Sequence, residues 1–310
     1  MRAARTHDPF AHQGVLLEDE RGADGRLVRT ATVFLTGREC PWHCVMCDLW
    51  HHTIAEDTPR GAIPHQIAEA ATWLRAQGEA PCAVKLYNAG SFFDRRAIPD
   101  GDRQAIVDAL EPFAHVIVES HPALVGDRTW RLQDGLAARG SSLEVAMGLE
   151  TAHPEALAAL DKGITVDRFA QAAADLRAHG VALRVFLLIH PPFIALDDQP
   201  AWLGRSIAAA EACGATAIAL IPTRPGEPAL DAAAHAGRFV APRLADIEAA
   251  AEHARSRSES ARVFVDLWDI ERFASCPACL PGRRERLRQF NLTRAFEPLP
   301  SCACCGEAAA

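Results

Sequence analysis

Residues 40–47 read CPWHCVMC, a cysteine-rich loop that follows an apolar run at residues 31–35. The loop places Cys40, Cys44 and Cys47 at the spacing C-x3-C-x2-C. Three thiolates so close together can bind three irons of a small iron–sulfur cube, which leaves the fourth iron without a protein ligand. Because that iron must take a ligand from outside the chain, the loop predicts an open, reactive iron–sulfur cluster.

A zinc site is the main alternative for this loop, since zinc takes four protein ligands, or three and a water molecule. His43 is a candidate fourth ligand, but its neighbour Cys44 would be a ligand too, and the geometry is then poor. A disulfide cannot use three cysteines evenly, and the chain shows no secretory context. The spacing and the position after a strand favour the cluster.

The composition indicates a globular protein of one domain or slightly more. The chain has 310 residues, of which 49% are apolar, so it can bury a sizeable core. No apolar run approaches the ~18 residues of a membrane span, and the polar N-terminus is unlike a signal peptide. We therefore expect a cytoplasmic protein without membrane contact. Ten cysteines then indicate metal sites, and a net charge of −8 argues against a large nucleic-acid footprint.

Short apolar runs alternate with amphipathic helical stretches from residue 30 onward, which predicts parallel βαβ units. The expected strands are 31–35, 83–87, 116–119, 143–147, 183–189 and 217–221, and the expected helices are near 65–77, 102–112, 128–139, 166–179 and 200–213. The predicted fold is α/β, a partial (β/α)6 TIM-like barrel with a C-terminal cysteine-rich metal-binding extension. We expect an N-terminal extension at 1–29 that forms a loop or short strand, a barrel at 30–225, and a C-terminal region at 226–310. The last region adds a helix near 242–256 and a strand near 263–267.

Polar residues follow the ends of several predicted strands, where the active site of such a barrel lies. The second strand is followed by the candidate binding residues Asn88, Ala89, Gly90 and Ser91. Their backbone carbonyls and the Ser91 hydroxyl could accept hydrogen bonds from an ammonium group, or the segment is an ordinary tight turn. Glu119 and Glu150 end two adjacent strands, and His190 ends the next, as a proton donor or a polar core residue.

The cysteine motif resembles that of the radical S-adenosylmethionine (SAM) enzymes. The resemblance implies a [4Fe–4S] cluster on Cys40, Cys44 and Cys47, with SAM on the open iron. It implies reductive cleavage of SAM to a 5′-deoxyadenosyl radical that abstracts hydrogen from a substrate, and a flavodoxin- or ferredoxin-like electron donor. It also places Met46 near the adenine of SAM.

The other SAM contacts follow from the same resemblance. Residues 88–91 take the place of the Gly-Gly-Glu stretch that binds the SAM amino group in many members. Glu119 and Glu150 would line the SAM site, and substrate would meet the radical near His190.

Further motifs narrow the resemblance. ESHP at 119–122, GLET at 148–151 and DKG at 161–163 look like the Elongator catalytic subunit branch. GSFFD at 90–94 and PPF at 191–193 are most similar to the radical SAM subunit of archaeosine synthase and its relatives. That similarity implies a modified, 7-deazaguanine-type base in tRNA as substrate. The chain departs from the pattern at His190 and at Asn88-Ala89, which would face substrate. A small metabolite is the alternative substrate, and a non-enzymatic iron–sulfur or zinc protein is the alternative class.

The C-terminal region carries a second cysteine pattern. Cys276 and Cys279 form one C-x2-C pair, and Cys302 and Cys305 form another after 22 intervening residues, with Cys304 as a spare thiol. Two such pairs predict structural zinc, and a four-thiolate auxiliary iron–sulfur cluster is the alternative.

Between the two cysteine pairs lies an arginine-rich segment. Residues 276–305 contain five arginines and two glutamates. Arg283, Arg284 and Arg286 could contact RNA phosphates, or the segment is a solvated helix face. Cys82 and Cys213, in predicted elements elsewhere, are expected to be small buried groups.

Overall fold

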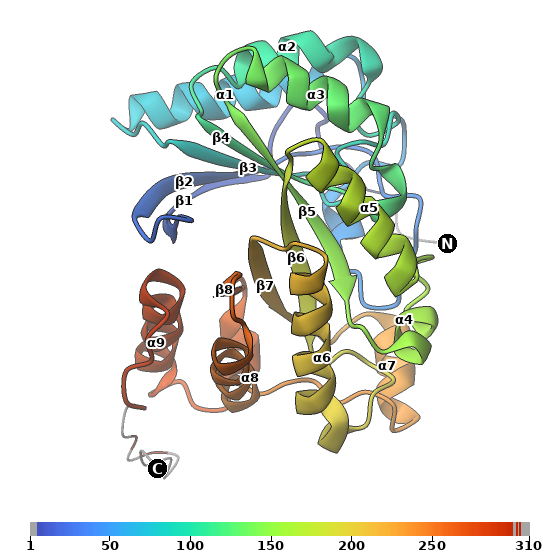
Figure 1. Cartoon of the computed structure of the whole chain (residues 1–310), viewed down its shortest axis with the longest axis vertical. Coiled ribbons are helices and arrows are strands. Elements are labelled where there is room, and N and C mark those ends of the chain that lie inside the picture. The colour runs from blue at the N-terminus through green and yellow to red at the C-terminus, as the bar shows by residue number, and fades with distance from the viewer. Residues whose placement is uncertain (1–4, 300–301, 303, 305–310) are drawn as a thin grey trace. The chain divides into compact units, whose positions relative to one another are not determined.

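The computed structural model describes residues 5–299, 302 and 304. Eight strands are hydrogen-bonded into one sheet in sequence order, from β1 at one edge to β8 at the other (Figure 1). The strands are β1 (Gly14–Arg21), β2 (Leu27–Phe34), β3 (Ala83–Tyr87), β4 (His115–Glu119), β5 (Ser142–Glu150), β6 (Ala182–Ile189), β7 (Ala217–Pro222) and β8 (Arg262–Val265). Helices connect most of the strands, so the α/β class and the barrel-like strand order are confirmed.

Helices α1 to α8 of the described chain occupy stretches between the strands, as the βαβ pattern predicts, and α9 follows the last strand. They are α1 (Ala62–Ala76), α2 (Arg103–Ala109), α3 (Asp127–Ala137), α4 (Pro154–Ala159), α5 (Val166–Ala178), α6 (Gln199–Ala212), α7 (Pro228–His235), α8 (Leu244–Arg257) and α9 (Leu280–Thr293). Short 3-10 turns cover η1 (Leu49–His52), η2 (Asp100–Asp102), η3 (Pro122–Leu124), η4 (Leu196–Asp198) and η5 (Ile270–Phe273). The six predicted strands correspond to β2–β7, and the N-terminal extension contains β1. No helix of the described residues is long and apolar enough to cross a membrane.

The chain divides into two compact units. The first runs to Glu20 and continues through residues 28–148 and 162–184. The second contains residues 21–27 and 149–161 and then runs from Val185 onward. Both differ from the contiguous domains expected from the sequence, whose boundaries remain a prediction.

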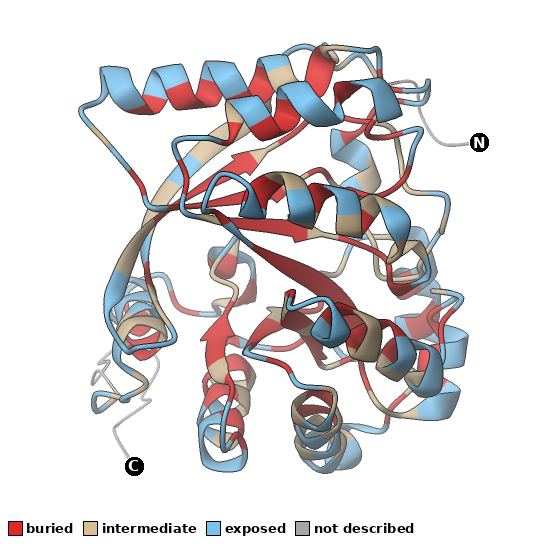
Figure 2. Cartoon of the chain, turned by 45° about the horizontal axis from the view of Figure 1, so that its top comes forward, coloured by how far each residue is buried: buried red, intermediate tan, exposed pale blue. Residues whose placement is uncertain are grey.

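The first unit is built on strands that pair in parallel, with β2 against β3, β3 against β4 and β4 against β5. Along β3 the side chains alternate between two faces. Val84 and Leu86, both fully buried, lie on one face, and Lys85 and Tyr87 lie on the other. Helices α1, α2 and α3 are buried along one stripe and exposed along the opposite one (Figure 2). The first unit therefore has an apolar layer on one side of its strands and a polar side on the other.

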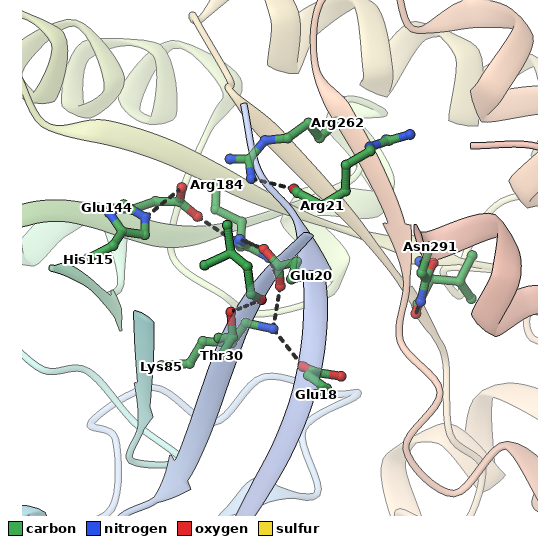
Figure 3. A network of polar contacts seen from close by, with 12 residues as sticks. Glu18, Glu20, Arg21, Thr30, Lys85, His115, Glu144, Arg184, Arg262 and Asn291 are labelled. Atoms are coloured by element: carbon green, nitrogen blue, oxygen red, sulfur yellow. Dashed lines mark hydrogen bonds and ion pairs between the residues drawn. The ribbon is translucent and has the colours of Figure 1, made fainter. Parts of the chain in front are cut away.

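A buried ionic network occupies that polar side (Figure 3). Lys85 Nζ lies 2.5 Å from Glu20 Oε2 and 2.8 Å from Glu18 Oε1. Arg184 is ion-paired with Glu20 and, at 2.5 Å from Nε to Oε1, with Glu144. Burial alone would raise the pKa of Glu20, but the charges of Arg184 and Lys85 reverse the effect and lower it to about 2. The network is the exception to the apolar runs that predict these strands.

The second unit contains the parallel pair β7 and β8. The Asn291 side chain of α9 forms hydrogen bonds of 2.8 Å with both the backbone NH and the carbonyl of Val265 in β8. Glu211, at the end of α6, accepts hydrogen bonds from the backbone amides of residues 259–261, which precede β8. These contacts lower the pKa of Glu211 to about 2 against the effect of burial. The loop before β8 and the strand itself are thus held by side chains of two helices.

Candidate cysteine-loop site

The loop of residues 35–48 leaves the carboxyl end of β2 and carries the three predicted cluster ligands. In the described structure Cys40, Cys44 and Cys47 are half-buried thiols outside any disulfide. Burial raises the pKa of the Cys40 thiol to about 11 and that of Cys47 to about 12. Binding of a metal group would therefore release protons from these thiols.

The separation of the three thiols bears on the kind of metal group. Among the described residues, a set of thiols that all lie within 4.8 Å of one another occurs at Cys276, Cys279 and Cys302, and the cysteine loop forms no such set. Ligands of one tetrahedral ion must lie that close, whereas the ligands of a cube bind different irons and lie further apart. The three loop thiols therefore do not have the spacing of ligands to one tetrahedral ion.

Arg5 joins the two ends of the cysteine loop. Its Nη2 lies 2.6 Å from Glu39 Oε2, next to the first cysteine. Its Nη1 donates to the Trp50 carbonyl at 2.7 Å and to Thr53 Oγ1 at 2.5 Å, just beyond the last cysteine. One guanidinium group thereby links the segments that flank the cysteines on both sides.

The predicted binding segment, residues 88–91, packs directly on the cysteine loop. A Cβ atom on Gly90 would lie 3.4 Å from the Arg38 carbonyl oxygen and 3.5 Å from the Cys40 nitrogen. The Asn88 side chain is fully buried, and neither its oxygen nor its nitrogen has a hydrogen-bond partner in the described structure. Because an unpaired buried amide costs about 1–3 kcal/mol, this amide is suited to a site that a polar ligand completes. The residues present fit SAM in this respect.

Two other members of the predicted site have internal partners. The Glu119 carboxylate accepts a hydrogen bond from the Asn88 backbone NH at 2.7 Å. Burial raises the pKa of Glu119 to about 7, and the hydrogen bonds from the backbone of residues 88–90 oppose that rise. The Ser91 hydroxyl is buried, lies 3.0 Å from Ser120 Oγ and accepts from the His121 NH at 3.1 Å. Both side chains hold the 88–91 segment in place against the end of β4.

A ring stack, not expected from the sequence, fixes the middle of the cysteine loop. The Trp42 ring lies on the His121 ring with centroids 3.5 Å apart and an angle of 8°. His121 accepts from the Ala123 NH through Nδ1, so its Nε2 is the nitrogen that donates to the Lys162 carbonyl at 2.9 Å. Burial lowers the pKa of His121 to about 4, which keeps the ring neutral. Two features of the sequence could have pointed to this stack: the tryptophan inside the cysteine motif, and the histidine of the ESHP stretch.

Lys162 and Gly163 complete this arrangement, and both belong to the DKG stretch. The positive charge of Lys162 lowers the pKa of Cys40, Cys47 and Glu119, so it lies within electrostatic reach of all three. Gly163 has φ +72°, and a Cβ atom there would lie 3.0 Å from Trp42 Nε1. The first unit thus brings together the three cysteines, Met46, residues 88–91 and Glu119, and adds Trp42, His121, Lys162 and Gly163.

The close contact at Gly163 can be tested by substitution. Gly163→Ala and Gly180→Ala both put a side chain on a left-handed residue, at φ +72° and +68°, which costs about 1–2 kcal/mol. A Cβ on Gly180 meets no atom within 4 Å, whereas at Gly163 it displaces Trp42 from His121. We expect the decrease in unfolding free energy caused by Gly163→Ala to be at least about twice the decrease caused by Gly180→Ala. We also expect the Gly163→Ala variant to bind less iron after anaerobic reconstitution. Equal losses and equal iron would show that the ring stack does not position the loop.

Glu150 and His190 belong to the second unit and are described by themselves. Glu150 is the last residue of β5 and His190 directly follows β6, and both have positive φ, 66° and 54°. His190 Nδ1 lies 3.2 Å from the Val240 carbonyl, so Nδ1 carries the proton and Nε2 is free to accept one. Burial lowers the pKa of His190, which favours the neutral ring. This geometry suits a proton acceptor better than the proton donor considered from the sequence.

The C-terminal cysteines lie in the second unit. Cys276 and Cys279 directly precede α9, and the Cys276 and Cys302 sulfurs are 3.7 Å apart. Zn–S bonds of about 2.3 Å at tetrahedral angles put two sulfurs about 3.8 Å apart. The three thiols therefore have the spacing of ligands to one ion. The predicted fourth ligand, Cys305, lies outside the described residues, and Cys304 is exposed.

The arginine segment between the cysteine pairs is helix α9, and its predicted role is wrong for two residues. Arg283 is buried and its Nε lies 3.1 Å from Glu248 Oε2. Arg286 is buried too, with Nη2 2.6 Å from Glu252 Oε1. Both guanidinium groups neutralise carboxylates of α8, so they neither contact phosphate nor form a solvated face.

Two further cysteine predictions are also wrong. Cys82, just before β3, is exposed, and Cys213, at the end of α6, is half-buried. Neither is the small buried group that its position in a predicted element suggested.

The sequence was compared with those of known proteins. No family model matches the chain. It is 27% identical over 194 residues to the archaeosine synthase subunit beta of Methanosarcina acetivorans, which covers 59% of this chain and 55% of that protein. It is 28% identical over 172 residues to the protein of the same name from Thermococcus kodakarensis, covering 54% and 52%. The chain spans about half the length of the curated relatives it matches.

Solved structures show the same fold. Elp3 of Methanocaldococcus infernus aligns with a TM-score of 0.52 at 15% identity, over 66% of this chain and 54% of that one. SuiB of Streptococcus suis, solved with S-adenosylmethionine, aligns with a TM-score of 0.52 at 12% identity, over 74% and 48%. By sequence the chain is therefore similar to proteins named archaeosine synthase subunit beta, and by fold it is similar to Elp3 and SuiB.

Proposed function

We propose that the chain is a radical SAM enzyme whose [4Fe–4S] cluster is held by Cys40, Cys44 and Cys47. When bound, such a cluster supplies the electron that cleaves SAM to a 5′-deoxyadenosyl radical, which takes a hydrogen atom from the substrate. The observation that carries the proposal is the packing of residues 88–91, with the unpaired Asn88 amide, directly on the cysteine loop. The same loop holds Met46, which we assign to the adenine side of the SAM site.

The residues around the loop have distinct roles in this proposal. Asn88 offers a donor and an acceptor to the polar groups of SAM. Lys162 contributes positive charge beside the cysteines, which suits a site for an anionic cluster and a carboxylate. Glu119 orients residues 88–90 through their backbone amides. Glu150 and His190 are proposed for SAM and substrate, respectively, with His190 Nε2 as a proton acceptor.

The proposed substrate is a modified, 7-deazaguanine-type base in tRNA. Support comes from the two relatives named archaeosine synthase subunit beta. Because those relatives are named as subunits, we also propose that the chain works with a second protein, and with a small electron-transfer protein as reductant. A cytoplasmic location remains a prediction. The acidic net charge of −8 favours the alternative, a small-molecule substrate.

At the C-terminus we propose a structural zinc ion on Cys276, Cys279 and Cys302, with Cys305 as fourth ligand. The 3.7 Å between the Cys276 and Cys302 sulfurs supports one ion over a second cluster. Because the cysteine pair precedes α9, the ion would fasten the chain end to the start of that helix.

The experiment uses anaerobically purified, cluster-reconstituted protein with dithionite and SAM. We expect 5′-deoxyadenosine by mass spectrometry, about four irons per chain, and about one zinc. Iron binding without SAM binding would contradict the proposed enzymatic activity and would favour a redox or RNA-binding protein. About eight irons without zinc would contradict the assignment of the C-terminal cysteines.

A further inference from the structure

A small pocket lies in the first unit, beside the segment that follows the SAM-binding residues. Its volume is about 120 Å³, and its floor is apolar, with Phe92, Phe93 and Leu132. Three arginines and one aspartate line it as well: Arg103, Arg128, Arg131 and Asp100. Ligand pockets for whole cofactors have about 300–1,000 Å³. This pocket is therefore the size for one small group, and its charged lining favours an anion.

The arginines of the pocket differ in what they already contact. Arg128 is ion-paired with Asp100 and donates to the Ile98 carbonyl at 2.6 Å, so it is held in place. Arg103 and Arg131 are exposed and form no ion pair with any described residue, and the same holds for Arg95 in the neighbouring loop. Burial lowers the pKa of Arg128, the charge of Asp94 opposes this, and the charges of Arg131 and Arg95 lower the pKa further, so the three guanidinium groups lie near one another. Because Asp100 and Asp94 offset only part of this positive charge, the exposed arginines around Arg128 are suited to an external anion.

The location of this cluster connects it to the candidate active site. Arg95 belongs to the loop after β3, and Arg128 and Arg131 belong to the start of α3, after β4 (Figure 1). The cysteine loop follows β2. Because β2, β3 and β4 pair in parallel, all these segments begin at the carboxyl ends of neighbouring strands. The backbone NH of Phe92 donates to the Glu119 carbonyl at 2.9 Å, which ties the pocket floor to the proposed SAM segment. A polymeric substrate that reaches the cysteine loop can also reach this surface.

We propose that the arginine surface, formed by Arg95, Arg103, Arg128 and Arg131, binds backbone phosphates of an RNA substrate. The inference rests on the RNA substrate of the proposed function and names the surface that holds it. A guanidinium group offers a planar pair of donors that matches two phosphate oxygens. One phosphate enters the pocket beside Arg128, and its neighbours along the backbone meet the exposed arginines. We assign the phosphate-binding role to this surface in place of the arginines of α9, because two of those form ion pairs inside the protein.

The test compares two triple variants with the same loss of charge. Arg95→Gln, Arg103→Gln and Arg131→Gln are combined in one, and Arg26→Gln, Arg75→Gln and Arg177→Gln, exposed arginines elsewhere, in the control. Binding of fluorescently labelled tRNA to the reconstituted protein is measured by anisotropy across a series of KCl concentrations. Each lost phosphate contact lowers the slope of log K against log salt by about 0.9. We expect the slope of the first variant to fall by about 2–3 and its affinity at about 0.1 M salt to fall at least about 30-fold, with the control close to wild type.

The outcomes separate the surface from the proposed function. Equal losses in both triple variants would overturn the surface, because only total charge would then matter. Tight tRNA binding by wild type and by the first variant alike would overturn the surface and leave an RNA substrate standing. If wild type binds no tRNA but forms 5′-deoxyadenosine, the RNA substrate and this surface both fail while the radical SAM activity stands. Thermal unfolding of both variants should match wild type, since the substituted side chains are exposed.

Discussion

Cys40→Ala is expected to abolish 5′-deoxyadenosine formation, with a fall of more than about 100-fold, to the level of protein-free controls. Losing a group that merely orients a metal ligand typically costs 10–100-fold, and removal of a ligand should cost more. The loop offers three thiols, and the two that remain cannot hold the cluster and leave the same iron open. Because Arg5 and the Trp42–His121 stack already fix the loop around the cysteines, no neighbouring thiol can move in as a replacement.

The matched control for this substitution is Cys82→Ala. It removes the same thiol from an exposed position just before β3. Its iron content and its 5′-deoxyadenosine formation should equal those of wild type, measured under the same anaerobic conditions. Retention of activity in Cys40→Ala would contradict the assignment of the cluster. Loss in both variants would indicate general sensitivity to thiol removal rather than a ligand role.

Arg184→Met is expected to reduce the free energy of unfolding by about 3–5 kcal/mol, the usual cost of breaking a buried ion pair. Arg184 is almost fully buried and neutralises both Glu20 and Glu144. Methionine fills much of the same space but leaves two carboxylates with less positive charge. Lys85, 2.5 Å from Glu20, compensates only part of the loss. Chemical denaturation followed by circular dichroism measures the difference.

The pH dependence of stability gives a second measurement of the same network. The pKa of Glu20 is lowered to about 2 in the folded chain, against an ordinary value of 4.5 for a glutamate side chain. In the unfolded chain the carboxyl binds a proton near pH 4.5, so stability is present above that pH and is lost as the pH falls toward 2. Removal of Arg184 raises the pKa of Glu20, and this acid-dependent loss should become smaller in Arg184→Met.

Arg29→Met is the control for the buried arginine. Arg29 pairs with Glu79 at 3.0 Å on the surface, where solvent screens the interaction. A much smaller loss of stability is expected there. Similar losses for Arg29→Met and Arg184→Met would show that the buried network contributes no more than a surface pair.

Other predictions from the sequence concern the candidate site. The cysteine spacing and residues 88–91 identified two segments that the structure brings into contact, because both follow parallel strands at one sheet edge. The Trp42–His121 stack was not predicted, because its partners are far apart in the sequence and carry no shared pattern. Lys162 and Gly163 were noted only as part of a motif, and their contact with the cysteine loop depends on how the chain folds back.

The alternation of strands and helices and the candidate metal-binding loops could be predicted from the sequence alone. Both are local features: the period of the apolar residues placed β3 at 83–87 and α5 at 166–178 to within a residue, and the cysteine spacing predicts a ligand set. Which charged residues are used inside the protein, by contrast, depends on tertiary packing. Arg283 and Arg284 are neighbours with the same side chain, yet the first is buried against Glu248 and the second is exposed. Their difference depends on which face of α9 meets α8, and packing between distant segments sets that face.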